Sequence, residues 1–356
     1  MTKLEKLREI IKSMSDGILI SSETNRLYFT DFEYSDGYVI VTKNKAYLIT
    51  DFRYAEAAKN EADKNFEIVI FKGLKDGNIQ KILEENDVKT LLFEDNSVTY
   101  SELKMFENTF CGVSFVPAGN ILENLREYKS DIEAEYVIKA QRIAEKSLDM
   151  LLSDLDLNMT EKEVAAYLEY LMKKNGADGI SFNTIAVSGK ASSLPHGVPR
   201  NVKLEKGFLT LDFGAVYKGY HSDMTRTVSI GKATEEMKKV YNTVLEAQEL
   251  AINAIMNGEK SCFNIDKISR DFIYNMGYEG CFGHGLGHGV GLLIHESPRL
   301  SPAAPKEKML EKGHIVTVEP GIYLENKFGV RIEDMIYMSE EGPKNITMTP
   351  KRLIEI

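Results

Sequence analysis

Short apolar runs alternate with amphipathic stretches along the N-terminal third of the chain. Runs rich in β-forming residues predict strands at 17–20, 37–42, 46–50, 66–71 and 89–94. Between them, apolar positions at helical spacing predict helices over 2–14, 76–86 and 99–108. The polar pair Lys43-Asn44 separates two strand-like runs and predicts a hairpin turn. The N-terminal third is therefore predicted to be an α/β domain of its own.

The pattern becomes helical over residues 120–175. In the second helical stretch, Thr160 and Glu163 have the spacing of a capping box, and Gly176 lies at the predicted C-terminal stop. We place a domain boundary near 126–131, which divides the chain into domains 1–126 and 127–356. Beyond residue 180, strands and hairpins alternate with one or two helices, notably over 233–255, which predicts an α+β second domain.

Length and composition agree with a globular protein of two domains. The chain has 356 residues, of which 43% are hydrophobic and 28% charged. Its net charge of −10 argues against a nucleic-acid partner, since such binding neutralises phosphates with Lys and Arg. No apolar run approaches the roughly 20 residues that cross a membrane, and the charged N-terminus has no signal core. Its three cysteines match neither a disulfide framework nor a metal motif, so we expect a cytoplasmic protein.

The segment 207–230 reads as two β-runs around a turn at Tyr217-Lys218-Gly219. A turn centred between Tyr217 and Lys218 places Asp212 opposite Asp223. Like charges on directly opposed strand positions are destabilising, and aspartate is a poor strand former. An isolated strand aspartate is usually a solvated edge residue, whereas an opposed pair indicates a cation between the two carboxylates.

A second hairpin presents the same arrangement over residues 316–335. A loop centred near Asn326 places Glu319 opposite Glu333. Both pairings depend on the turn assignment, because a slip of one residue moves every side chain to the other face. Two hairpins that each oppose two carboxylates strengthen the case for a cation site.

The glycine-rich stretch 281–296, CFGHGLGHGVGLLIHE, supplies histidines to the same site. Five glycines between 283 and 291 argue against a helix, so we predict an extended strand with His284 and His288 on one face. Glycine also lets a backbone or a ligand approach closely. A helical HExxH zinc site is excluded, because Arg299 stands where the second histidine would be. Four carboxylates and one imidazole suit two divalent metal ions in a hydrolase.

These segments together resemble a known family. The motifs LPHG (194–197), LDFGAVYKGYHSDMTRT (211–227), GHGLGHGVGLLIHE (283–296), VEPGIY (318–323) and GVRIED (329–334) resemble the pita-bread dinuclear metallopeptidases. The N-terminal α/β domain is similar to that of the Xaa-Pro aminopeptidase and prolidase branch. The resemblance implies a creatinase/prolidase-like domain at 1–126 and a pita-bread catalytic domain at 127–356. The implied catalytic fold is α+β, a curved antiparallel sheet with flanking helices.

The resemblance also implies roles for individual residues. The implied metal ligands are Asp212, Asp223, His288, Glu319 and Glu333, with Asp223 and Glu333 bridging two ions. The implied catalytic and supporting residues are His196, His295, Glu319, His284, Tyr323 and Arg331. Mn²⁺ is the expected metal, with Co²⁺ or Zn²⁺ as alternatives, and a carboxylate-rich shell independently favours a hard ion such as Mn²⁺.

The implied activity is that of an Xaa-Pro aminopeptidase, in which a metal-bridging hydroxide hydrolyses the peptide bond that precedes proline. Proline-containing peptides are the expected substrates and a homodimer is the expected assembly. A strict dipeptidase (prolidase) that acts only on Xaa-Pro dipeptides is the alternative, since a loop that closes the substrate groove would decide between them. A non-catalytic binding protein on the same scaffold is disfavoured, because such relatives typically lose metal ligands and all five are present here.

Overall fold

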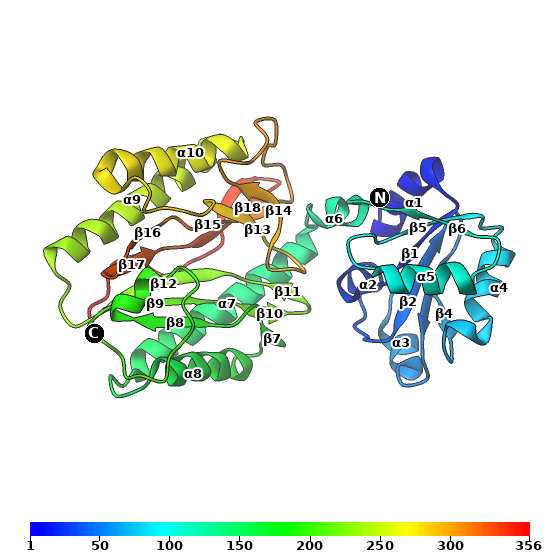
Figure 1. Ribbon diagram of the computed structural model, residues 1–356, viewed down its shortest axis with the longest axis horizontal. Coiled ribbons are helices and arrows are strands. Elements are labelled where there is room, and N and C mark those ends of the chain that lie inside the picture. Colours follow the sequence, from blue (N-terminus) through cyan, green and yellow to red (C-terminus); the bar gives the residue numbers. More distant parts are fainter. The chain divides into compact units, whose positions relative to one another are not determined.

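The computed structural model describes residues 1–356 and separates them into two units, Met1–Arg126 and Glu127–Ile356 (Figure 1). In the first unit, six strands form one mixed sheet in the order β4-β3-β2-β1-β5-β6. The strands are β1 (Gly17–Ile20), β2 (Gly37–Thr42), β3 (Ala46–Thr50), β4 (Glu67–Ile70), β5 (Thr90–Phe93) and β6 (Ser114–Pro117). The helices are α1 (Lys3–Met14), α2 (Glu23–Thr30), α3 (Ala55–Glu61), α4 (Asn78–Glu85), α5 (Tyr100–Thr109) and α6 (Ile121–Arg126).

Four of the five apolar runs predicted as strands lie inside this sheet, and the run at 66–71 forms the edge strand β4. Strands β1 and β3 are buried along their whole length, which explains why their sequences are continuously apolar. The predicted hairpin is confirmed, since Val41 pairs with Ala46 around Lys43-Asn44. Helices α2 and α3 and strand β6 were not predicted. Helix α2 begins at the N-cap Ser22, whose hydroxyl accepts from the Asn25 amide, and ends at Asp31 in a left-handed conformation.

The second unit packs helices against antiparallel strands on two sides (Figure 1). Its helices are α7 (Asp131–Asp154), α8 (Glu161–Lys174), α9 (Glu235–Met256) and α10 (Cys262–Ile273). Its strands are β7 (Gly179–Ile180), β8 (Ile185–Ser188), β9 (Gly207–Phe213), β10 (Ala215–Tyr217), β11 (Tyr220–His221), β12 (Met224–Ile230), β13 (Gly287–Gly289), β14 (Glu296–Leu300), β15 (Ile315–Val318), β16 (Gly321–Leu324), β17 (Phe328–Arg331), β18 (Asp334–Ser339) and β19 (Gly342–Asn345).

Two apolar cores hold these helices in place. Buried residues of α7 and α8 pack with those of β8, β9 and β12, whereas α9 and α10 pack with β15 to β18. The capping box of Thr160 and Glu163 is confirmed at the start of α8, and Gly176 follows its end with a φ of 103°. The helical stretch predicted from residue 120 is divided into α6 and α7, because Ser130 caps a new helix. None of the helices combines the length and the apolar character needed to cross a lipid bilayer.

All strand pairings in this unit are antiparallel, but the ladders are interrupted. The β9–β12 ladder ends at Phe213 paired with Met224, and the β10–β11 ladder continues beyond Asp223. The β15–β18 ladder ends at Val318 paired with Asp334, and the β16–β17 ladder starts again at Gly321. Both interruptions coincide with residues predicted to be metal ligands.

The predicted pairing of Asp212 with Asp223 is wrong by two residues. The turn is formed by Lys218 and Gly219, both at positive φ (50° and 78°), as in a type I′ hairpin. Asp212 therefore pairs with Thr225, and Asp223 lies just before β12. Because the shift is an even number of residues, the two aspartates keep to the same face.

The register predicted for the second hairpin is confirmed. Leu324 pairs with Phe328 around Asn326, which has a φ of 58°, and the same register holds in the β15–β18 ladder. Glu319 and Glu333 are thus level with each other, in the gap between the two ladders. Residues separated from these glutamates in sequence can approach them there without breaking strand hydrogen bonds.

Candidate metal centre

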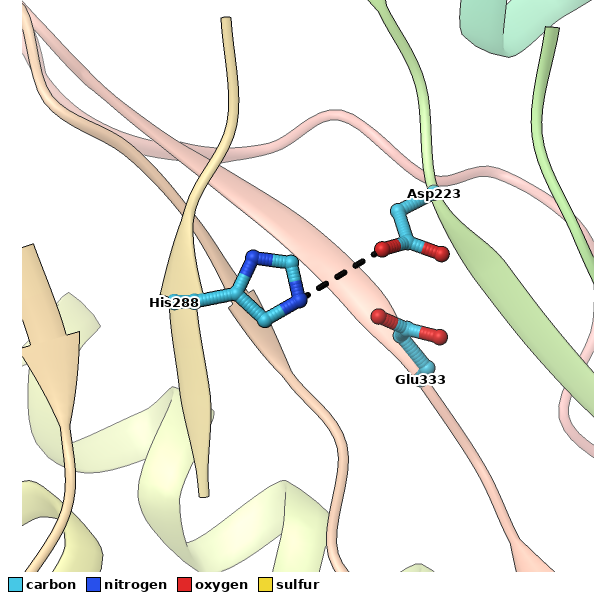
Figure 2. A group of neighbouring side chains, drawn as sticks. All are labelled: Asp223, His288 and Glu333. Carbon is cyan, nitrogen blue, oxygen red and sulfur yellow. Dashed lines mark ion pairs between the residues drawn. The ribbon is translucent and has the colours of Figure 1, made fainter. Parts of the chain in front are cut away.

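Three buried side chains converge in the second unit, each from a different segment. Figure 2 shows the imidazole of His288 facing the carboxylates of Asp223 and Glu333. One ligand atom of each residue lies within 4.8 Å of those of the other two. The Nε2 atom of His288 is 3.5 Å from Asp223 Oδ2 and 3.4 Å from Glu319 Oε1. Groups of this kind, one imidazole nitrogen with several carboxylate oxygens, bind divalent metal ions.

The protonation of His288 can be assigned from its backbone contact. Its Nδ1 atom is 3.0 Å from the carbonyl oxygen of Gly289, which can only accept, so Nδ1 bears the hydrogen. Burial lowers the pKa of His288 to about 3, so the ring is neutral at pH 7. The lone pair of Nε2 consequently faces the carboxylate oxygens of Asp223 and Glu319, and the imidazole has no hydrogen on this side. The imidazole nitrogen and these oxygens are all electron-pair donors, so a cation placed between them would stabilise the group.

The carboxyl groups of the site also indicate that a cation is missing from their surroundings. Burial and the neighbouring carboxylates raise the pKa of Asp223 and Glu333 well above their usual range, and burial raises that of Glu319 to about 8. Oxygen Oδ1 of Asp212 and Oε1 of Glu333 are buried and accept no hydrogen bond. Unsatisfied buried acceptors are rare in folded proteins. The residues present therefore fit a divalent cation, which would bind these oxygens and offset their charge.

Arg331 connects the predicted carboxylate ligands to one another. Its guanidinium donates to Asp212 Oδ2 at 2.6 Å, to the Tyr323 hydroxyl at 2.7 Å and to Thr225 Oγ1 at 3.1 Å. Thr225 in turn donates to Glu333 Oε2 at 2.7 Å. The structure thus places Tyr323 and Arg331 beside the carboxylates, as the resemblance implies. It adds Thr225, which sequence reasoning missed although it lies in the same motif and pairs with Asp212.

His284 is directed toward Tyr323. Its Nδ1 atom is 2.8 Å from the carbonyl oxygen of Gly285 and its Nε2 atom is 3.0 Å from the Tyr323 hydroxyl. Burial lowers the pKa of His284 to about 4, so Nε2 accepts the hydroxyl hydrogen of Tyr323. The prediction of one extended strand through His284 and His288 is wrong, because β13 covers only Gly287–Gly289. A register shift after His288 interrupts the pairing of β13 with β14.

The glycines of this segment allow neighbouring strands to approach. A Cβ atom on Gly287 would lie 1.9 Å from the Thr317 carbonyl oxygen, and one on Gly289 would lie 2.2 Å from that of Ser297. Neither glycine has a positive φ, so close approach and not backbone conformation requires them. The expectation that glycine serves close backbone contact here is confirmed.

Gly287→Ala is expected to destabilise the protein by roughly 3 kcal/mol, because β15 cannot move away without breaking its ladder. Gly283→Ala is the matched control, since no atom lies within 4 Å of a Cβ there and its φ is not positive. The free energies of unfolding of both variants can be measured in urea. Equal stability of the two variants would contradict the steric account.

A cavity of about 780 Å³ opens onto the centre. His196 and His295 line it, both exposed, and the ring of His295 lies edge-on to that of His288 with 4.4 Å between centroids. Arg299 also lines the cavity and was not predicted, because no pattern in the sequence indicates its position opposite His288 in the β13–β14 ladder. The apolar part of the wall includes Phe182, Pro195, Val198 and Ile294. The cavity is large enough for a short peptide.

Comparison with known proteins identifies the family. Residues 135–340 match Metallopeptidase family M24 and residues 3–128 match the Creatinase/Prolidase N-terminal domain. The chain is 36% identical to an Xaa-Pro dipeptidase of Pyrococcus furiosus, over 98% of this chain and 99% of that protein.

Solved structures agree with this assignment. An Xaa-Pro dipeptidase from Bacillus anthracis superimposes with a TM-score of 0.93 at 40% identity, over 99% of both chains. An X-Pro aminopeptidase from Thermotoga maritima gives a TM-score of 0.90 at 36% identity, over 96% of this chain and 98% of that chain. The chain therefore belongs to metallopeptidase family M24 and is a divalent-metal-dependent exopeptidase of the pita-bread fold with a creatinase/prolidase N-terminal domain.

Proposed function

We propose that the protein hydrolyses Xaa-Pro dipeptides, which is the alternative to the aminopeptidase activity first expected from the sequence. Relatives named Xaa-Pro dipeptidase, from Pyrococcus furiosus and Bacillus anthracis, support this choice. The aminopeptidase remains the second candidate, because the similar structure from Thermotoga maritima bears that name. The position of Arg299 in the cavity wall, opposite His288, is the observation that favours the dipeptidase.

Arg299 places a positive charge next to the proposed metal centre, on the strand position directly opposite the proposed ligand His288. It pairs with His288 across β13 and β14, and directly opposed residues have Cβ atoms about 5 Å apart. Its side chain is exposed to the cavity and has no acidic partner within salt-bridge distance. In an Xaa-Pro dipeptide the free carboxylate follows the scissile bond by one residue. A guanidinium binds such a carboxylate through paired, charge-assisted hydrogen bonds.

The proposed metal ligands are Asp212, Asp223, His288, Glu319 and Glu333, and the proposed metal is Mn²⁺, with Co²⁺ or Zn²⁺ as alternatives. Four carboxylates neutralise two divalent ions, and oxygen-rich shells suit Mn²⁺. Two such ions, when bound, lower the pKa of a water molecule and polarise the scissile carbonyl. The unsatisfied oxygens of Asp212 and Glu333 support the assignment.

Glu319 and the exposed histidines would handle protons and charge around the scissile bond. Glu319 is partly exposed to the cavity, so its carboxylate can accept a proton there and release it to the substrate. The prolyl nitrogen has no hydrogen of its own, so a proton from Glu319 would complete its release. His196 and His295 line the cavity and would donate hydrogen bonds to the oxyanion that forms on the carbonyl.

The substrate class can be tested with metal-stripped protein reconstituted with Mn²⁺. Ala-Pro, Ala-Pro-Ala, Ala-Pro-amide and Met-Ala-Ala would be incubated in parallel and the products identified by mass spectrometry. Efficient cleavage of Ala-Pro alone is expected. Cleavage of Ala-Pro-Ala into Ala and Pro-Ala at a comparable kcat/KM would replace the dipeptidase by the aminopeptidase. A protein that cuts none of the four with any of the three metals would contradict both.

We also propose that the protein is a homodimer, as expected from the resemblance of its motifs to the aminopeptidase and prolidase branch. Light scattering should give twice the mass of one chain. The mass of a single chain would dispose of this proposal and leave the site assignment unaffected.

A further inference from the structure

A buried glutamine fills the gap in the hairpin that bears Glu319 and Glu333. Gln248 lies on α9 and is fully buried. Its Nε2 atom donates to the carbonyl oxygen of Val318 at 3.2 Å and to that of Ile332 at 3.3 Å. These carbonyls belong to the residues immediately before the two glutamates. One side-chain amide thus bridges both strands at the peptide bonds that precede them.

Pro320 explains why the gap needs an outside donor. Continuing the register of both ladders places Pro320 opposite Ile332, and proline has no N–H for the Ile332 carbonyl. The amides of the two glutamates turn away from the hairpin as well. Glu319 N donates to Leu286 O at 2.8 Å, and Glu333 N donates to Thr225 O at 3.2 Å. The ladder is therefore interrupted at this point. Gln248 supplies the hydrogen bond that Pro320 cannot give to the Ile332 carbonyl, and it adds one to the Val318 carbonyl.

The orientation of the Gln248 amide is fixed from its other side. Oε1 accepts a hydrogen bond from Lys351 Nζ at 2.9 Å, so the donating nitrogen must face the two carbonyls. Lys351 is held in turn by Asp334 Oδ2 at 3.2 Å. All the hydrogen-bonding capacity that the amide needs while buried is used, so it forms a rigid bridge.

We infer that Gln248 is a positioning residue for the metal centre. It fixes the backbone at Glu319 and Glu333 together, and so sets the spacing of their carboxylates. This inference rests on the proposed assignment of the two glutamates as metal ligands. The side chain touches neither carboxylate and acts only through the peptide groups before them.

Gln248→Met keeps the length and volume of the side chain and removes both donors. The expected result is a loss of Mn²⁺ affinity of about 10–100-fold, measured by competition with a chelating dye well below the unfolding temperature. Thr243→Val is the matched control. It removes one hydrogen bond of a buried side chain on the same helix, from the Thr243 hydroxyl to the Lys239 carbonyl, and leaves Gln248 and Lys351 unchanged. The control is expected to lose stability and to bind Mn²⁺ as the wild type does.

Equal Mn²⁺ affinity in Gln248→Met and Thr243→Val would overturn the inference and reduce Gln248 to a purely structural role. If the methionine variant does not fold, Gln248→Glu repeats the test, since it has the same shape and still accepts from Lys351. Failure of the ligand assignment itself would look different, because Glu333→Gln would then bind Mn²⁺ as tightly as the wild type.

Discussion

Asp223→Asn is expected to lower kcat/KM on Ala-Pro by on the order of 10³-fold and to leave the protein folded but poor in metal. Asparagine has the shape of aspartate but no charge. The site therefore loses one anionic ligand, the Asp223 Oδ2 atom that lies 3.5 Å from His288 Nε2. Metal content and activity of the purified variant can be measured on one sample. Asp149→Asn, on the exposed side of α7, is the control and should retain both.

The same variant is expected to be at least as stable as the wild type when both are stripped of metal. The pKa of Asp223 is raised in the folded state, chiefly by burial and by Glu333, so its ionised form is disfavoured there. A carboxyl group with a raised pKa binds more protons when folded than when unfolded. Metal-free wild type should therefore lose stability as pH rises above about 4, and Asp223→Asn should lose less. A lower melting temperature of the metal-free variant at pH 7 would contradict this account.

Arg299→Leu is expected to reduce kcat/KM on Ala-Pro by about 10–100-fold and to leave cleavage of Ala-Pro-amide nearly unchanged. A hydrogen bond to a charged group is worth about 1.5–3 kcal/mol, which corresponds to that range. The amide lacks the carboxylate, so it gains nothing from the guanidinium. Kinetics on the acid and the amide, side by side, measure the difference directly.

Arg352→Leu is the control for this prediction, since Arg352 is also exposed and does not line the cavity. An equal loss of kcat/KM on Ala-Pro and on Ala-Pro-amide would show that Arg299 supports the site without binding the substrate carboxylate. The dipeptidase proposal would then lose its structural argument, and the metal assignment would stand.

The residues proposed as metal ligands stand out in the sequence because their chemistry conflicts with their local setting. Carboxylates in strands and glycines beside histidines oppose ordinary propensity, and such conflicts mark functional sites. The loop at Asn326 was located correctly, since asparagine tolerates the positive φ found there. The turn at Lys218-Gly219 was placed one residue early, because lysine rarely adopts the left-handed conformation that it has here.

The supporting contacts could not be predicted, because they join residues far apart in the chain. Gln248 meets the hairpin across 70 and 84 residues, and Thr225 meets Glu333 across 108. Arg299 lies opposite His288 because β13 pairs with β14, and the glycine-rich pattern does not specify that pairing. Helical periodicity finds α9 but does not distinguish a buried glutamine from a solvated one.

The most direct test of the metal centre is to return Mn²⁺ to metal-stripped protein while counting bound ions and measuring Ala-Pro hydrolysis. The account predicts no hydrolysis without metal, a rise in rate with occupancy, and two ions per chain at saturation. Full activity in the stripped protein, or saturation without any bound ion, would contradict the assignment of Asp212, Asp223, His288, Glu319 and Glu333 as its ligands.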